Sequence, residues 1–129
     1  MRRTLLGLLI TAGMILSGGQ ARAHHSYSAV YYEDRTEKIE GDVVQFHYQN
    51  PHTFLQVEAP DDKGVTQRWM VEWVASWQLS RKGVDRGTLK PGDHVIIVGK
   101  PGRNAAEHRM HLMQITRPAD GWKWAANPD

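Results

Sequence analysis

The chain has 129 residues, with 16 Lys and Arg against 14 Asp and Glu, seven His, five Trp and no Cys. This length and polarity fit one small globular domain, and they exclude a disulfide scaffold, a collagen-like chain and an intrinsically disordered chain. The formal net charge is +2, and most of the excess base lies in the first residues.

The first 23 residues have the pattern of a secretory signal peptide. Arginines at positions 2 and 3 precede an apolar stretch over residues 5–16, and Ala21-Arg22-Ala23 has small residues at both recognition positions of a cleavage site. The apolar stretch is shorter than the roughly 18–20 residues that a membrane-spanning helix needs, which disfavours the alternative of a retained anchor. We expect cleavage after Ala23, a periplasmic location and no transmembrane segment in the mature chain.

Cleavage after Ala23 would change the charge balance. It removes Arg2, Arg3 and Arg22 and no acid, so 106 of the 129 residues remain, with 13 Lys and Arg against 14 Asp and Glu and a net charge of −1. Binding to a phosphate backbone depends on several basic side chains acting together. The mature domain is therefore predicted to have no nucleic-acid partner, and it keeps all seven His.

The mature chain divides by pattern into an arm, one domain and a tail. Residues 24–36 are expected to form an irregular N-terminal arm, residues 37–117 the domain, and residues 118–129 a loosely attached C-terminal tail. In the alternative, Trp122 and Trp124 of the tail dock on the domain. In residues 39–48 the apolar phase shifts from odd to even positions near Gly41. This shift predicts a bulge or a sharp bend in the first strand.

Four more strands and one short helix are expected in the domain. Strands are predicted over residues 53–59, 66–74, 94–99 and 110–116. A helix capped by Ser76 and stopped by Gly83 lies between the third and fourth strands. The order β-β-β-α-β-β predicts an all-β fold, a small five-stranded OB-like barrel with one short helix. An open antiparallel sheet with one helix is the alternative.

The expected cleavage places His24 and His25 at the new N-terminus. The free amine and the near ring nitrogen of His24 can then chelate one metal ion, and neutral imidazoles suit copper, zinc and nickel. Cleavage after Arg22 would instead put His25 third from the amine, a spacing that binds Cu(II) through backbone nitrogens. In the alternative interpretation, both histidines are solvated residues of a polar junction.

Asn50-Pro51-His52 is a second candidate, at the corner between the first two strands. A proline-stiffened corner on a rigid scaffold would hold His52 at the end of the barrel, where it can join His24 and His25 as a metal ligand. In the structural alternative, Asn50 and Pro51 form a turn and the His52 side chain bonds a nearby carbonyl.

The third candidate lies on the predicted third strand. Trp69 on the face of an OB barrel can stack on a sugar or a base, and Glu72 can accept sugar hydroxyls; with Asn50 they form the predicted ligand-binding set. The alternation of Trp69 and Trp73 equally fits two core residues. Catalytic patterns are missing from the sequence, which has no thiol, no nucleophile elbow and no glycine-rich phosphate loop.

The chain resembles the DUF6152 family of small exported bacterial proteins in the order of four motifs: Ala23-His24-His25-Ser26, Asn50-Pro51-His52, Trp69 with Glu72, and Leu89-Lys90-Pro91-Gly92-Asp93. The resemblance covers about residues 23–117 and implies a signal peptide, a periplasmic location and a compact β-rich domain. The family's function is unknown, so the resemblance implies no catalytic residues. It draws attention to His24, His25 and His52, and the tail after Pro118 departs from the pattern.

These patterns lead to one functional hypothesis and one alternative. We predict a non-enzymatic periplasmic binding protein that binds a transition metal, copper or else zinc, through His24, His25 and His52. The alternative is a metal-independent OB-fold module that binds an oligosaccharide, a small ligand or a partner protein. Its ligand-binding residues would be Asn50, Trp69 and Glu72.

Overall fold

The computed structural model describes residues 26–127, and this part of the chain contains six strands, two short α-helices and one 3-10 turn. In chain order they are α1 (Ser26–Val30), β1 (Glu37–His47), β2 (Phe54–Pro60), β3 (Thr66–Glu72), α2 (Ser76–Ser80), β4 (His94–Pro101), η1 (Ala105–Glu107), β5 (Arg109–Arg117) and β6 (Trp122–Ala125). The expected signal peptide, His24 and His25 lie outside the described residues.

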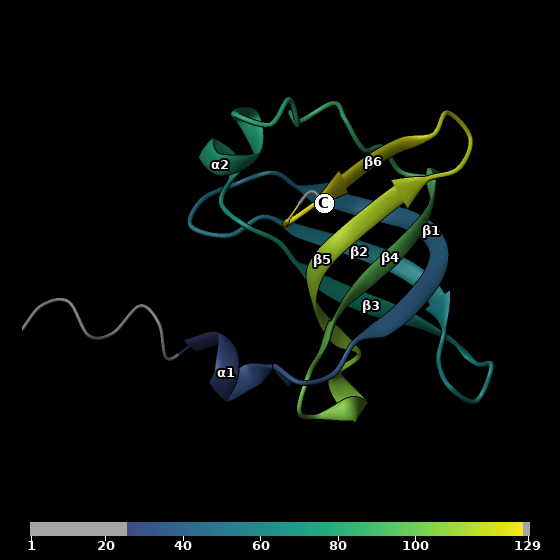
Figure 1. Cartoon of the computed structure of the whole chain (residues 1–129). Helices are drawn as coiled ribbons and strands as arrows, with labels where there is room; N and C mark the ends of the chain where they lie inside the picture. The colour runs from purple at the N-terminus through teal and green to yellow at the C-terminus, as the bar shows by residue number, and fades with distance from the viewer. Residues whose placement is uncertain (1–25, 128–129) are drawn as a thin grey trace, which may run out of the picture.

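Within residues 26–127, five of the strands close into a barrel (Figure 1). Neighbouring strands follow the order β3-β2-β1-β4-β5, and β3 also pairs with β5 in parallel, which closes the ring. The other four pairings of the barrel are antiparallel. This connectivity, with one helix between β3 and β4, is that of the OB fold. The predicted five-stranded OB-like barrel is confirmed.

The first strand bends so that it can pair with both of its neighbours. Its first half pairs with β4 and its second half with β2, and the register with β2 shifts between Val43 and Gln45. A Cβ atom on Gly41 would lie 1.9 Å from the carbonyl oxygen of Glu58. Only glycine therefore allows the two backbones to approach this closely. The bulge predicted from the phase change is confirmed.

Alternate residues of the strands point into the barrel and form its core. Apolar side chains with no exposed surface are Leu55, Val57, Val71, Trp73, Leu79, Val95, Ile97, Met110 and Ile115. The alternation also determines which residues face outward, because successive side chains of a strand lie on opposite faces. Every strand of the barrel thus presents a second, outer row of side chains, and the candidate site is built on that row.

Helix α2 covers one end of the barrel by burying Leu79. The prediction that Ser76 caps this helix is wrong. Ala75 holds the N-cap position without a side-chain hydrogen bond, and the Ser76 hydroxyl instead donates to Oδ1 of Asn50 at 3.0 Å. Gly83 lies just beyond the helix with φ of 76°, as expected for the glycine that ends it.

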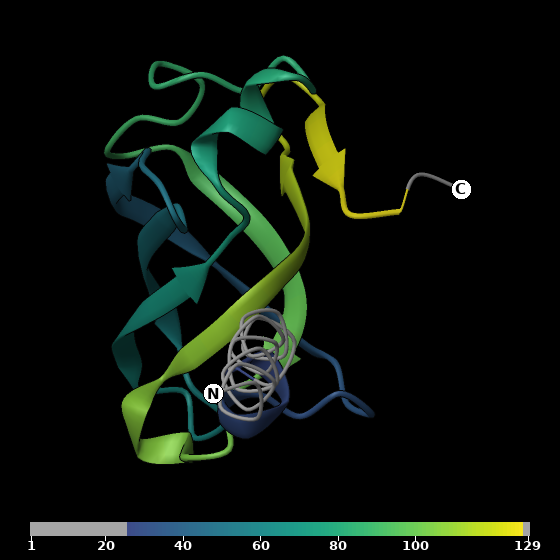
Figure 2. The same cartoon turned by 90° about the vertical axis from the view of Figure 1, so that its left-hand side faces the viewer.

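The structure differs from the loosely attached tail that we expect for residues 118–129. Strand β6 pairs antiparallel with β5, and both views show it beside that strand (Figures 1 and 2). Trp124 is 8 % exposed, and its ring lies edge-on to Trp73 with 5.0 Å between centroids. Because Trp124 covers part of the core residue Trp73, this segment belongs to the domain.

The N-terminal arm also differs from the irregular segment that we expect, since residues 26–30 form helix α1.

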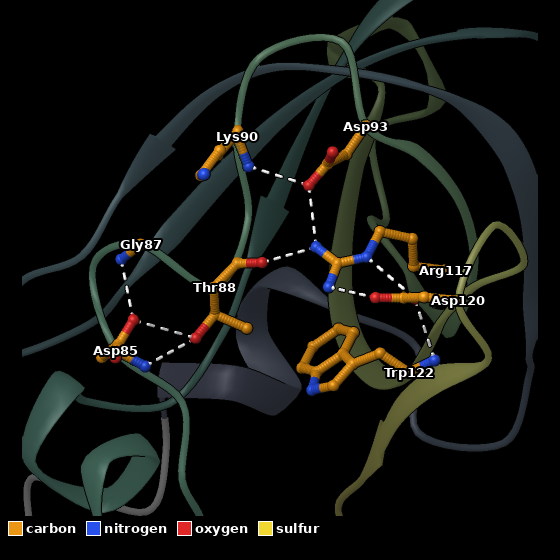
Figure 3. A network of polar contacts seen from close by, with 8 residues as sticks. All are labelled: Asp85, Gly87, Thr88, Lys90, Asp93, Arg117, Asp120 and Trp122. Carbon is orange, nitrogen blue, oxygen red and sulfur yellow. Dashed lines mark hydrogen bonds and ion pairs between the residues drawn. The ribbon is translucent and has the colours of Figure 1, made fainter.

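Arg117 at the end of β5 connects the turns that precede β4 and β6 (Figure 3). Its guanidinium donates to the Asp93 carboxylate at 2.9 Å and to the Thr88 carbonyl at 2.6 Å. It also donates to the Asp120 carboxylate at 2.8 Å. Asp93 in turn accepts from the backbone N–H of Lys90 at 3.0 Å. These bonds fix the loop before β4 against the turn before β6.

Replacing Trp124 with alanine is expected to lower the free energy of unfolding by about 2–3 kcal/mol, because it removes buried apolar area and uncovers Trp73. Urea unfolding measures the change. Lys123→Ala is the matched control, since Lys123 is exposed on the same strand, and it should stay within about 0.5 kcal/mol of the parent. Equal stability of the two variants would show that β6 contributes no more than a loose tail.

Candidate functional site

Glu72 is the one charged side chain that is buried within residues 26–127, at 7 % exposure. It ends β3 on the outer row, because its neighbours Val71 and Trp73 are in the core. A carboxylate removed from water must be compensated by hydrogen bonds or opposite charge. The groups that compensate Glu72 therefore define the site.

Three side chains surround the Glu72 carboxylate. His52 places Nδ1 2.5 Å from Oε1, and the Tyr31 hydroxyl donates to Oε2 at 2.5 Å. Arg109 contributes a more distant positive charge, with a guanidinium nitrogen 3.5 Å from Oε2. Both oxygens of the acid are thus occupied by short contacts, and Arg109 balances the charge of the carboxylate at longer range.

Strand register places the β5 residues beside Glu72. In the parallel pairing of β3 with β5, Glu72 lies opposite His111 and Met70 lies opposite Arg109. Met110 and Leu112 point into the core, so Arg109 and His111 share the outer row with Glu72. A histidine and an arginine that follow Glu72 by more than thirty residues are brought to it in this way.

His52 lies beside Glu72 because Thr53, the residue that follows His52, forms two backbone hydrogen bonds with residues just after β3. The Thr53 backbone N–H donates to the Val74 carbonyl at 3.2 Å, and the Trp73 N–H donates to the Thr53 carbonyl at 2.8 Å. Thr53 is fully buried. These two bonds hold the corner after β1 against Glu72 and fix where the imidazole can lie.

Two tyrosines lie over this part of the outer surface, Tyr27 in helix α1 and Tyr31 directly after its end. The Tyr27 ring stacks on His111 with 4.3 Å between centroids and on His52 with 5.4 Å. Its hydroxyl lies 3.3 Å from Nε2 of His52. Tyr31 is 2 % exposed. We call Tyr27, Tyr31, His52, Glu72, Arg109 and His111 the Glu72 cluster.

Burial shifts the pKa values of three residues in the cluster, Tyr27, Tyr31 and His111. Burial, followed by the charge of Glu72, raises the pKa of the Tyr27 hydroxyl above its usual 10.0. Burial and the hydrogen bond to Glu72 raise the pKa of Tyr31 as well. Burial lowers the pKa of His111 below its usual 6.5. Near pH 7 the two phenols are therefore protonated and the His111 imidazole is neutral.

Tyr27, His52 and Glu72 stand in the order hydroxyl, imidazole, carboxylate that nucleophilic catalysis uses. The distances are 3.3 Å from the Tyr27 oxygen to Nε2 and 2.5 Å from Nδ1 to the Glu72 oxygen. A nucleophile is activated by a lowered pKa or by a base that removes its proton readily. The raised pKa of Tyr27 opposes that role, so the arrangement is better suited to holding an imidazole than to forming a phenolate.

The structure brings two of the predicted site residues together and places two others, Asn50 and Trp69, in different contacts. His52 and Glu72, assigned by sequence to two different sites, are in direct contact. Asn50 lies next to them in the chain but bonds to Ser76. Trp69 is buried, and its indole N–H donates to the Ala59 carbonyl at 3.2 Å. Trp69 thus fits the core interpretation.

Sequence reasoning missed four members of the cluster, namely Tyr27, Tyr31, Arg109 and His111. In the sequence, the apolar Met110 lies between the polar residues Arg109 and His111, and this alternation indicates that Arg109 and His111 share one face of the strand. That this face is beside Glu72 follows only from the parallel pairing of β3 with β5.

The described residues do not hold enough metal ligands at one place. Within residues 26–127, no group of three or more His, Cys, Asp or Glu side chains is arranged to hold a metal ion. The Glu72 cluster offers two imidazoles, and its carboxylate is engaged by His52 and Tyr31. A metal site here would need further ligands from residues before Ser26.

Fold and site together define a small OB-type β-barrel domain with a buried carboxylate cluster on its outer surface. The model of DUF6152, a family of unknown function, matches residues 13–111, and the chain belongs to this family. The matched range includes every residue of the Glu72 cluster. No curated protein matches the chain. In residues 26–127, neither α-helix has the length and apolar character needed to cross a bilayer.

Proposed function

We propose that this protein is an exported, non-enzymatic binding protein that holds a transition metal ion, copper, through His24, His25 and His52. We add His111 to this ligand set. The observation that carries the proposal is the position of Tyr27. It packs on both His52 and His111, and it follows His25 by only two residues.

His52 has the carboxylate partner that metal-binding histidines commonly have. A metal-bound histidine commonly donates its other ring N–H to a carboxylate, which fixes the tautomer and the ring orientation. Glu72 holds Nδ1 of His52 in this way. The other nitrogen, Nε2, is in hydrogen-bond contact with the Tyr27 hydroxyl at 3.3 Å. We assign this nitrogen to the metal, which would displace the hydroxyl.

The covalent chain supports the participation of His24 and His25. Consecutive Cα atoms are about 3.8 Å apart, so the Cα atom of His24 lies within about 11 Å of that of Tyr27. Tyr27 itself contacts both imidazoles of the cluster. The two described imidazoles therefore lie within reach of the N-terminal histidines.

Copper is the metal that this ligand set favours. After cleavage behind Ala23, the set would comprise an amine and imidazole nitrogens, which suit copper, zinc and nickel. Among divalent first-row metals, copper binds such donors most tightly. Zinc remains the competitor to include in the experiment. The proposed export fits the same proposal, because cleavage after Ala23 would create the free amine of His24.

A Cu(II) titration of the chain that begins at His24, followed by calorimetry and electron paramagnetic resonance, tests the function. We expect one ion to bind with sub-micromolar affinity. A His24→Ala/His25→Ala double variant should bind about a hundredfold more weakly, which corresponds to about 2.7 kcal/mol. Native intact mass of the periplasmic protein should show a start at His24 and the added mass of a metal.

The matched control is His94→Ala. His94 is an exposed histidine on β4 whose ring nitrogens already contact Asp42 and Glu40, so its removal should leave copper affinity unchanged. Equally weak binding by the parent and the double variant would contradict the proposal. A mature chain starting elsewhere would remove the amine–imidazole chelate from it.

A further inference from the structure

An open groove of about 560 Å³ lies on the outer surface of the barrel and shares Arg109 with the Glu72 cluster. Its lining residues are His47, Gln49, Phe54, Met70, Glu107 and Arg109. The volume falls within the range of roughly 300–1,000 Å³ that is usual for small-molecule sites. We call this open groove the outer groove.

Two of the residues that line the outer groove, Phe54 and Met70, are apolar, whereas the same face of the sheet is charged farther along. Phe54 pairs across the strands with His47, and Met70 pairs with Arg109. Farther along β2 and β3, the cross-strand pair on this face is Glu58 with Arg68, which form an exposed ion pair. The change from charged to apolar side chains marks a surface suited to the body of a small ligand.

Arg109 supplies the positive charge of the groove and Glu107 a negative charge, but neither Glu107 nor Glu72 binds the guanidinium closely. One guanidinium nitrogen is 3.5 Å from Glu72, whose oxygens are engaged by shorter contacts. The other is 4.0 Å from Glu107, which is 51 % exposed. A charge-assisted bond between guanidinium and carboxylate is usually about 2.7–2.9 Å long. Arg109 therefore retains donors for a second anion.

We propose that the outer groove binds a small carboxylic acid with an apolar body. The carboxylate is held by Arg109, and the apolar part lies on Phe54 and Met70. His47 and Gln49, which also line the groove, offer further hydrogen-bonding groups. This site shares Arg109 with the Glu72 cluster but contains none of the proposed copper ligands. Its test contains no metal, so either proposal can fail without the other.

The test is a titration of the metal-free chain that begins at His24 with 4-phenylbutyrate, compared with 4-phenylbutanol. The alcohol has the same apolar body but no charge. Nitrogen–proton correlation spectra locate the site, and calorimetry gives the affinity. We expect the acid to bind saturably, with shifts centred on Met70 and Arg109. The alcohol should bind about tenfold more weakly, because it lacks the charge-assisted bond.

Two variants separate the groove from the cluster. Arg109→Gln should weaken binding of the acid about tenfold, and Arg68→Gln, the control on the same outer face, should leave it unchanged. Since Arg109 also contacts Glu72, Met70→Glu provides a change that does not remove a cluster residue, and it should abolish binding. Equal binding of acid and alcohol, unchanged affinity in Arg109→Gln or Met70→Glu, or no saturable binding would overturn the proposal.

Discussion

Replacing Glu72 with leucine is expected to lower the free energy of unfolding by about 3 kcal/mol, because it leaves the buried Tyr31 hydroxyl and the half-buried His52 and Arg109 without their carboxylate. Tyr31 would lose its acceptor and His52 the partner of Nδ1. Leucine is similar in size, so the loss reports the polar contacts more than the packing. Urea unfolding followed by circular dichroism measures the change in stability.

The effect should extend to helix α1, which is held by the same residues. Tyr31 contacts Glu72, and Tyr27 stacks on His52 and His111. We therefore expect the Glu72→Leu variant to be cleaved faster by protease between α1 and β1. The control is Glu58→Leu, which removes an exposed acid paired with Arg68 on the neighbouring strand and should cost less than about 1 kcal/mol. Equal stabilities and cleavage rates in the two variants would contradict a structural role for the cluster.

Trp73→Ala is expected to destabilise the fold by about 3–5 kcal/mol, the usual cost of removing a large buried aromatic side chain. Trp73 has no exposed surface. It is in edge contact with Trp124 from β6 and lies 6.2 Å, between ring centroids, from Phe46 on β1. The substitution would leave a cavity between the barrel and its sixth strand. Urea unfolding at two temperatures gives the free energy.

Trp73→Phe should cost much less than the alanine substitution. The indole N–H of Trp73 is buried and has no hydrogen-bond partner in the described part of the chain. Phenylalanine removes that unsatisfied donor, whose burial costs about 1–3 kcal/mol, and this gain offsets part of the lost packing. The matched control is Trp77→Ala, since Trp77 is 52 % exposed on α2. If Trp73→Ala were as mild as the control, Trp73 would not be a principal core residue.

Arg109 connects the two proposed sites. One side of its guanidinium faces the buried acid that orients His52, and the same side chain lines the outer groove. Occupation of the groove by an anion would draw Arg109 away from Glu72 or share its charge. Comparing copper titrations with and without 4-phenylbutyrate would show how strongly the two sites are coupled.

The amino-acid sequence by itself determined the fold of the barrel. The order of strands and helix, the bulge between Val43 and Gln45, the close approach at Gly41 and the inward direction of alternate residues are all local properties. Each depends on the side-chain period of a strand or on the steric freedom of a glycine. His52 and Glu72 were also recognisable as unusual residues, one after a proline corner and one between core residues.

Only the tertiary structure decided that these residues form one cluster. His52 meets Glu72 because backbone bonds tie Thr53 to the end of β3, and His111 joins them through the parallel pairing of β3 with β5. Strand periodicity specifies which face a side chain occupies but not which strand lies beside it. The same reason explains β6, whose place depends on the contact of Trp124 with Trp73. Pairing between distant segments is determined by closure of the whole barrel, and no local pattern contains it.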